Sequence, residues 1–141
     1  MPNLITETAV KKTVYTDFNV NFNIHPVRGD LTLLKNEDAI SQSIQNIVQT
    51  NFYERRYRSY FGGNVRRYLF EDFTPLTLNS VQSAITNAIN SYEPRCNLIS
   101  VVVSAPNSGD DNTLAVTITF SLINSSTPIV LNTTLSLSRF R

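Results

Sequence analysis

Two residues of opposite charge flank a proline in the second half of the chain, where Glu93 and Arg95 stand on either side of Pro94. In an extended segment, residues two apart point to the same side, so both charges can share one face while the proline fixes the bend. An exposed pair would contribute about 0–1 kcal/mol. A pair buried against a second element or subunit would cost about 3–5 kcal/mol to break by removing one partner. Neither interpretation needs catalysis.

Paired carboxylates could cleave a glycosidic bond if they faced each other across a cleft. The candidates are Glu71, Asp72 and Glu93, among 11 acidic residues in the chain. Glu71 and Asp72 are adjacent in sequence, and Arg95 favours the ionised form of Glu93 rather than the protonated form of a general acid. The residues give this chemistry weak support, and a hydrolase stays open as an alternative.

Few residues in the chain suit nucleophilic catalysis or metal binding. His25 is the only histidine and Cys96 the only cysteine, so the chain holds no His/Cys ligand set for a metal. No GxSxG motif is present, and Gly62-Gly63 matches no common phosphate-binding pattern, which leaves a tight turn as the interpretation. We therefore expect no catalytic residue, metal or cofactor. His25 is expected to be structural, and Cys96 to be a small, partly buried apolar residue.

Arginines and aromatic residues are interleaved over residues 51–68. Binders of single-stranded nucleic acid use such interleaving, and Arg and Tyr also dominate the hot spots of protein interfaces. Because the net charge is only +1, the composition favours a protein interface over nucleic acid, with a solvated loop as the plain alternative. The candidate interface residues are Arg55, Arg56, Tyr57, Arg58, Arg66 and Arg67.

The composition is that of an ordinary globular protein. The 141 residues, 41% of them hydrophobic, suffice for one domain over residues 1–141, with residues 1–12 expected to be mobile. The near-neutral charge gives no general attraction to nucleic acid or to anionic lipid. No apolar run reaches the length of a membrane span, and the N-terminus lacks a secretory signal, so we expect a soluble protein with no membrane partner.

Two helices are expected from 3.6-residue periodicity. Asn36 is a predicted N-cap for a helix over residues 37–50. A second helix with a continuous apolar stripe is predicted over residues 77–92, capped by Thr77 or Asn79. A short helix is expected between the two.

Strand patterns occupy both ends of the chain. Apolar residues alternate with asparagines over residues 18–24, which predicts a half-buried strand or extended arm. The apolar run over residues 97–104 is typical of a central strand, and residues 112–123 and 128–140 supply two more, joined by turn formers. The expected fold class is α+β: two main helices and a short one packed on an antiparallel meander of three C-terminal strands. Nothing covers the edge of the last strand, which needs protection or a partner strand.

Several motifs together resemble one protein family. The segment "FGGNVRRYLFEDFTPLT", a helix, "NSYEPR" and a β-rich tail resemble the small baseplate wedge proteins of contractile-tailed bacteriophages, the gene-25-like sheath initiators. Relatives also occur in type VI secretion baseplates. The resemblance extends over most of the chain, including "YTDFNVNFNIHPVRGDL" upstream. The chain departs from it at Tyr57 and Ser59, where relatives usually carry prolines.

The resemblance implies a structural role. It assigns Glu93, Pro94 and Arg95 to the contact with the larger wedge subunits, and it implies that the first ring of tail sheath protein adds to the domain by exchanging strands. On this basis the C-terminal strands are expected to face the sheath, with tail tube or hub proteins as further partners in a hetero-oligomeric assembly. The location implied is the virion tail baseplate, assembled in the host cytoplasm. The sheath-facing residues named for these strands are Leu114, Val116, Ile118, Leu131 and Leu135.

Overall fold

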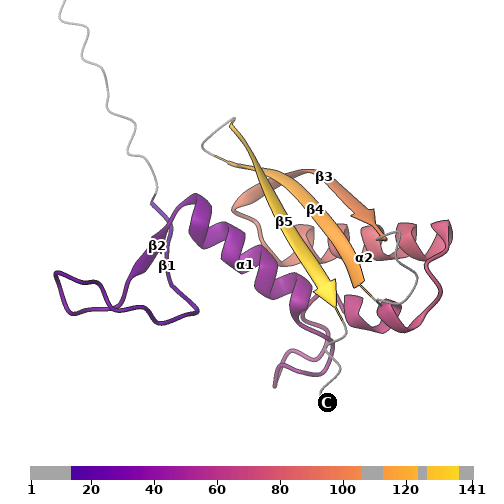
Figure 1. Ribbon diagram of the computed structural model, residues 1–141, viewed down its shortest axis with the longest axis horizontal. Coiled ribbons are helices and arrows are strands. Elements are labelled where there is room, and N and C mark those ends of the chain that lie inside the picture. Colours follow the sequence, from indigo (N-terminus) through magenta and orange to yellow (C-terminus); the bar gives the residue numbers. More distant parts are fainter. Residues whose placement is uncertain (1–13, 106–112, 124–126, 137–141) are drawn as a thin grey trace, which may run out of the picture.

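The computed structural model describes residues 14–105, 113–123 and 127–136 and confirms the α+β class (Figure 1). Two helices and a short 3-10 helix lie on one side of a three-stranded antiparallel sheet, and a two-stranded arm projects from the N-terminal side. The two turns predicted between the C-terminal strands and the first 12 residues lie outside the described residues. None of the described helices is long and apolar enough to cross a membrane.

The longer helix, α2, spans Pro75–Tyr92 and begins two residues earlier than predicted. Proline is favoured at the first helical position, because its missing N–H would have no partner there. The cap is Thr74, whose side-chain oxygen accepts a hydrogen bond from the backbone N–H of Thr77 at 3.3 Å. The prediction of a cap at Thr77 or Asn79 was therefore wrong, because Pro75 starts the helix instead of breaking the chain.

The other helix, α1, spans Glu37–Gln49, one residue shorter at its C-terminal end than predicted, and the short helix η1 spans Val65–Phe70. Asn36 occupies the N-cap position of α1 but makes no side-chain cap. Its side-chain oxygen instead accepts a hydrogen bond from the backbone N–H of Tyr15 at 3.2 Å, so Asn36 joins the N-terminal arm to α1. Five apolar residues of α1 are buried: Ala39, Ile40, Ile44, Ile47 and Val48.

The main sheet has the order β3-β4-β5, formed by Cys96–Ser104, Thr113–Leu122 and Pro128–Ser136. The central strand is therefore β4, and the expectation that residues 97–104 form the central strand was wrong. A continuous apolar run says that a strand has two non-polar faces, but not which strands flank it. In β3, Ile99 and Val102 are each 57% exposed, because the outer face of the sheet has no covering layer among the described residues.

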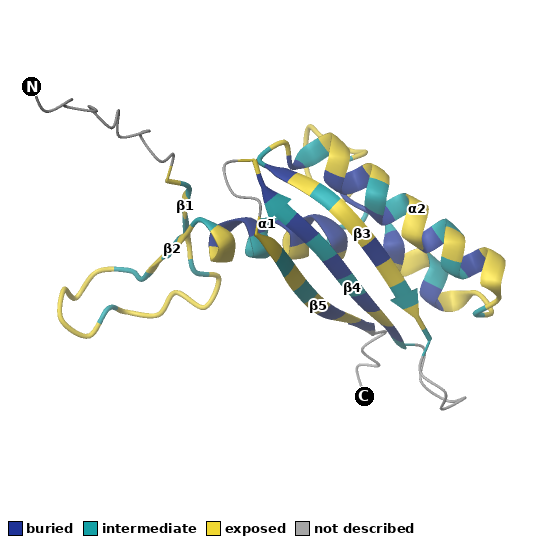
Figure 2. Cartoon of the chain, turned by 90° about the horizontal axis from the view of Figure 1, so that it is seen from above, coloured by how far each residue is buried: buried dark blue, intermediate teal, exposed yellow. Residues whose placement is uncertain are grey.

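The core lies between the helices and the inner face of the sheet. Figure 2 shows the alternation of buried and exposed residues along the strands, which is the pattern predicted for β4. Helix α2 packs mainly on β3, while α1 lies beside α2 and reaches β5. The inner face of β4 is almost completely buried and consists of Leu114, Val116, Ile118, Phe120 and Leu122.

The N-terminal arm consists of β1 (Thr16–Phe18) paired antiparallel with β2 (Leu33–Lys35), and the chain between them continues away from the domain. Of the strand predicted over residues 18–24, only the first residue belongs to β1, and the rest continues into the arm beyond it. The expectation that one face of this segment is buried was wrong. Phe18, Phe22 and Ile24 are 58%, 66% and 70% exposed, because the arm extends beyond the core instead of lying on it. Its base is fixed by Gln42 of α1, whose side-chain amide donates to the backbone oxygen of Phe18 at 2.8 Å.

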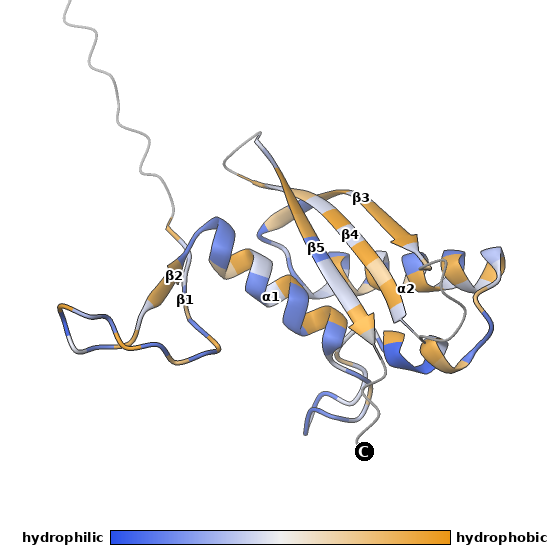
Figure 3. Cartoon of the chain, viewed as in Figure 1, coloured by the Kyte–Doolittle hydropathy of each residue, from blue (hydrophilic) through white to orange (hydrophobic). Residues whose placement is uncertain are grey.

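The three strands of the main sheet contain no charged residue. Figure 3 shows little hydrophilic colour on the sheet, whereas it gathers on α1 and on the loops. Isolated sheets usually carry charges on their edge strands, which discourage pairing with other chains. Both edge strands of this sheet lack that protection.

Candidate functional site

The buried carboxylate of Glu93 accepts hydrogen bonds from two side chains, those of Arg95 and Ser43. It forms a two-pronged ion pair with Arg95: the Nε atom donates to Oε1 at 2.6 Å and Nη2 donates to Oε2 at 2.7 Å. The hydroxyl of Ser43, on α1, also donates to Oε2 at 2.6 Å. The side chain of Glu93 is 2% exposed and that of Arg95 is 32% exposed. The pair is thus buried on the acidic side and open to solvent on the basic side.

This geometry follows from how α2 ends. Tyr92 is the last helical residue, and Glu93 leaves the helix with a non-helical φ of −125° and ψ of 79°. Pro94 then prevents the helix from continuing. Glu93 and Arg95 fall on the same side of the bend, as predicted, and the carboxylate turns inward against α1. Of the two arrangements considered from the sequence, the structure shows the pair buried against a second element rather than fully exposed. That element is α1 of the same chain.

Two opposing effects act on the pKa of Glu93. Burial raises the pKa, but the hydrogen bonds from Arg95 and Ser43 outweigh it, so the pKa lies below its ordinary value. The hydrogen bonds with Glu93 likewise raise the pKa of Arg95. A carboxyl that is ionised and fully hydrogen-bonded makes a poor general acid. The ion pair therefore positions the corner of the chain and does not supply protons.

A surface groove of about 760 Å³ runs from this ion pair to the loop over residues 51–63. Its lining includes Asp17, Pro94 and Arg95 as well as Arg55 and Arg58 of the loop. The structure therefore brings together the predicted Glu-Pro-Arg contact and two of the predicted interface arginines. We call this feature the Arg95 groove.

Aromatic contacts hold the loop wall of the Arg95 groove. The ring of Phe61 lies 4.7 Å from that of Tyr92, and the guanidinium of Arg55 lies 4.7 Å from the centre of the Phe61 ring. The hydroxyl of Tyr92 donates to the backbone oxygen of Tyr60 at 2.7 Å. The C-terminal end of α2 thus holds the loop through Tyr92 and the ion pair through the adjacent Glu93.

The remaining interface candidates do not line this groove. Arg56 and Tyr57 are exposed on the same loop. Arg67 lies over the ring of Tyr68 at 4.6 Å. Arg66 lines a separate cavity beneath β5. The set predicted from composition is therefore dispersed: two of its members line the Arg95 groove, one lines the separate cavity, and three line neither.

The residues considered for catalysis do not form a site. Glu71 and Asp72 are exposed. Burial, together with the nearby Glu93, raises the pKa of the Cys96 thiol to about 11, which suppresses the reactive thiolate. His25 lies in the arm, where its Nδ1 accepts hydrogen bonds from the backbone N–H groups of Val27 and Arg28. No cluster of three metal-ligating side chains occurs within the part of the chain that the structure describes.

The residues named as sheath-facing lie on the inner face of the sheet. Four of them are at most 8% exposed, and Leu131 is partly buried against the same core. Their side chains pack against the helices of this chain, because the strands alternate between the core and the open face. A contact between these strands and another subunit would have to use the backbone edge of β5 or the outer face.

Ser43 and Tyr92 contribute to the site but were not singled out in the sequence as parts of it, whereas Phe61 was among the aromatic residues noted in the predicted interface loop. Ser43 precedes a core residue of α1 and looks like an ordinary helix serine. Tyr92 was identified only as the last member of the apolar stripe of α2. The available signal was a serine in the middle of one amphipathic helix and a tyrosine at the end of another. Both features are too common to point to a site.

An α+β domain of this kind, with a groove shaped by an ion pair and two edge strands lacking protective charge, has surfaces that suit contacts with other subunits. The chain belongs to the family of baseplate wedge protein gp25, whose sequence profile matches residues 35–127. Baseplate wedge protein gp25 of Enterobacteria phage T4 is 37% identical over 86 residues. That match covers 61% of this chain and 64% of the T4 protein's own length.

Solved structures show the same fold. A chain in the six-fold symmetrised baseplate of the anti-feeding prophage is 26% identical, with a TM-score of 0.67 over 80% of this chain and 89% of that chain. A proposed tail lysozyme from Geobacter sulfurreducens is also 26% identical, with a TM-score of 0.68 over 77% and 97% of the two chains. A chain in the postcontracted pyocin R2 baseplate, at 22% identity and a TM-score of 0.55 over 71% and 96%, shares the fold. The T4 relative and the matched chain of the anti-feeding prophage are both baseplate proteins.

Proposed function

We propose that the chain docks on larger baseplate wedge subunits through the Arg95 groove and templates the first ring of tail sheath by strand exchange at β5. The main observation in favour of sheath templating is the unpaired edge of β5 among the described residues. Among the described residues β5 pairs only with β4, and it has no charged residue to discourage a further strand. An added strand would gain backbone hydrogen bonds along the edge.

The Arg95 groove supports the docking part of the proposal. Three arginines line it, Arg55, Arg58 and Arg95, beside the apolar and aromatic surfaces of Phe61 and Pro94. Arginine and aromatic side chains are the usual anchors of protein interfaces. Because Glu93 fixes the guanidinium of Arg95, the groove presents its donors in a set geometry, which reduces the entropy lost on binding.

The proposal also specifies the partners of the chain and its location. The partners are the larger wedge subunits and the tail sheath protein, with tail tube or hub proteins alongside, and neither nucleic acid nor a membrane is required. The chain acts as one domain without enzymatic activity, in the virion tail baseplate, after assembly in the host cytoplasm. The sheath contact uses the edge of β5 beside Leu131 and Leu135.

Tails assembled without this protein test the sheath part directly. Electron microscopy should show baseplates and bare tubes with at least about tenfold fewer sheathed tails, because sheath subunits lose the strand edge on which the first ring forms. Complementation with the wild-type chain is the control. Complete sheaths on tails that lack the protein would contradict the proposal.

A peptidoglycan hydrolase is the alternative, and the observation in its favour is the similarity to the proposed tail lysozyme. Purified protein would then clear peptidoglycan and lose this activity on substitution of Glu71 or Glu93. The low pKa and complete hydrogen bonding of Glu93 speak against it. Sheathed tails that fail to breach the cell wall would favour the hydrolase.

Charge reversal in the Arg95 groove tests the docking part. Arg58→Glu should reduce incorporation into wedges about tenfold, because it places an acidic group where the groove presents a guanidinium. Arg56→Glu is the matched control, since Arg56 is exposed on the same loop but does not line the groove. Incorporation is measured by quantifying the chain in purified baseplates. Equal incorporation of both variants would place the wedge contact elsewhere.

A further inference from the structure

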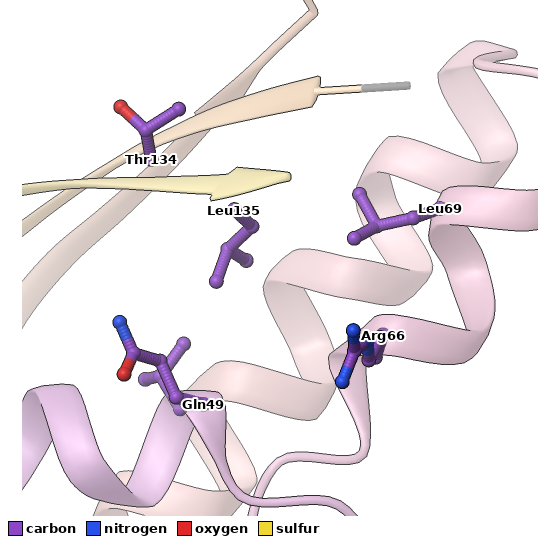
Figure 4. Close-up of a pocket in the computed structure, with 6 residues that line it drawn as sticks. Gln49, Arg66, Leu69, Thr134 and Leu135 are labelled. Atoms are coloured by element: carbon purple, nitrogen blue, oxygen red, sulfur yellow. The ribbon is translucent and has the colours of Figure 1, made fainter. Parts of the chain in front are cut away.

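A second cavity, of about 300 Å³, lies beneath the C-terminal end of β5, between that strand, the end of α1 and η1 (Figure 4). Val48, Leu69 and Leu135 supply its apolar lining, and all three are at most 8% exposed. Figure 4 shows Leu69 and Leu135 pointing into the space from η1 and β5, with Gln49 and Arg66 beside it. None of these residues lines the Arg95 groove.

Arg66 gives this cavity a positive charge at its polar side. Its side chain is exposed, and within the described residues it forms no ion pair closer than 4.0 Å. The carboxylate of Glu54 is bound by Asn51, which is the main cause of its lowered pKa, and Arg66 contributes only as a more distant charge. A carboxylate from outside the chain could therefore pair with Arg66 without displacing an existing partner.

The free edge of β5 runs beside this cavity. Side chains along a strand alternate between the two faces of the sheet. A strand added to β5 would send every second side chain to the helix side, where Leu135 points, and the others to the open side, where Figure 4 shows Thr134 pointing. In recognition by strand addition, backbone hydrogen bonds give affinity and pockets for alternate side chains give specificity.

We propose that this cavity selects the strand that joins β5. It takes one aliphatic side chain of an extended partner segment, and Arg66 pairs with an acidic side chain two positions away on the same face of that segment. The expected partner sequence is thus an alternating strand in which an aliphatic and an acidic residue are separated by one residue. This inference rests on the proposed addition of sheath strands to β5 and adds the feature by which the correct strand is recognised.

Substitutions at the rim of the cavity test the inference in assembled tails. Arg66→Glu and Gln49→Trp should each lower the number of sheathed tails about tenfold while the chain still enters baseplates, because one repels the acidic residue and the other fills the cavity. Arg67→Glu and Gln45→Trp are matched controls: both original residues are exposed, and neither lines the cavity. Sheathing at the wild-type level with Arg66→Glu and Gln49→Trp would overturn the inference.

A peptide probe tests the chemistry separately. The probe is the nine-residue strand Thr-Thr-Val-Thr-Leu-Thr-Glu-Thr-Thr, and its control carries Lys in place of Glu. Amide chemical shifts of β5 report binding. The acidic probe should bind about tenfold more tightly than the basic one, and Arg66→Glu should reverse this preference.

The other outcomes separate this inference from the proposed function. Equal binding of both probes along β5 would leave strand addition in place and overturn the selection by Arg66. An absence of shifts along β5 with both probes would count against strand addition itself and, with it, this inference. Binding only to a chain truncated after Ser136 would identify the chain's own C-terminal residues as the occupant and overturn the inference as well.

Discussion

Replacing Glu93 with alanine is expected to lower the free energy of unfolding by about 3 kcal/mol. Breaking a buried ion pair by removing one partner costs roughly 3–5 kcal/mol, and the lower end applies because Arg95 keeps contact with water. The substitution also deprives Ser43 of its acceptor and leaves space against α1. Urea unfolding of the purified chain measures the change.

Three further variants separate charge from packing at this position. Glu93→Gln keeps the shape but lacks the charge, so it should lose less stability than Glu93→Ala. Arg95→Lys keeps the charge but loses the two-pronged geometry. Glu71→Ala is the control: it removes an exposed carboxylate and should change stability by less than about 0.5 kcal/mol. If Glu93→Ala unfolds at the same urea concentration as Glu71→Ala, the ion pair does not stabilise the corner.

The same ion pair predicts a particular response to acid. The pKa of Glu93 in the folded chain is lowered from its ordinary value of 4.5, so unfolding allows the carboxyl to bind a proton more readily. The stability that the pair contributes is therefore complete above about pH 4.5 and is lost as the pH falls through the lowered pKa. Urea unfolding of the wild type and of Glu93→Gln should show a difference that narrows below this pH.

These stability measurements also set the order of experiments on docking. Because Glu93 is 2% exposed, its loss would reduce incorporation into wedges through unfolding as well as through the interface. Arg58 lines the Arg95 groove from an exposed position, so its reversal isolates the surface. Only the Arg58→Glu experiment can therefore assign the wedge contact.

The elements of the fold were predictable where one face of an element meets the core. The alternation in β4 and the apolar stripe of α2 are direct consequences of burial on one side, and both are found in the structure. The meander order of the three C-terminal strands was also predictable, because short turns join strands that follow one another in the sequence, and the structure has this order. The apolar residues of β3 were misleading, since they suggested a central strand, whereas β3 is an edge strand that pairs only with β4 among the described residues.

Only part of the candidate site could be predicted from the sequence. Glu93 and Arg95 were recognisable because a proline between opposite charges fixes their relative direction. Their burial depends on Ser43, 50 residues earlier, and the groove depends on Phe61 meeting Tyr92. Both contacts are tertiary, so no local pattern encodes them. The N-terminal arm shows the opposite case, since its apolar residues alternate as predicted but stay exposed, with no surface among the described residues covering them.

The second large effect is expected at Gly62, where alanine should lower the free energy of unfolding by about 2–5 kcal/mol. Gly62 has a φ of +108°, a backbone conformation that side chains with a Cβ rarely adopt. A Cβ there would also overlap the backbone oxygen of Thr50. Strained backbone costs about 1–3 kcal/mol and overpacking a similar amount. Thermal unfolding of the purified variant, together with its incorporation into baseplates, measures the result.

Gly29→Ala is the matched control for this substitution. Gly29 also has a positive φ, of +64°, but a Cβ there would meet no atom within 4 Å, so only the conformational cost of about 1 kcal/mol applies. Gly62 lies next to Phe61, the aromatic support of the loop wall, and Gly63 donates to the backbone oxygen of Ile47 at 3.1 Å. A displaced Gly62 should therefore reshape the Arg95 groove and reduce docking even in molecules that remain folded. If the two alanine variants lose equal stability, close packing against Thr50 does not hold this loop.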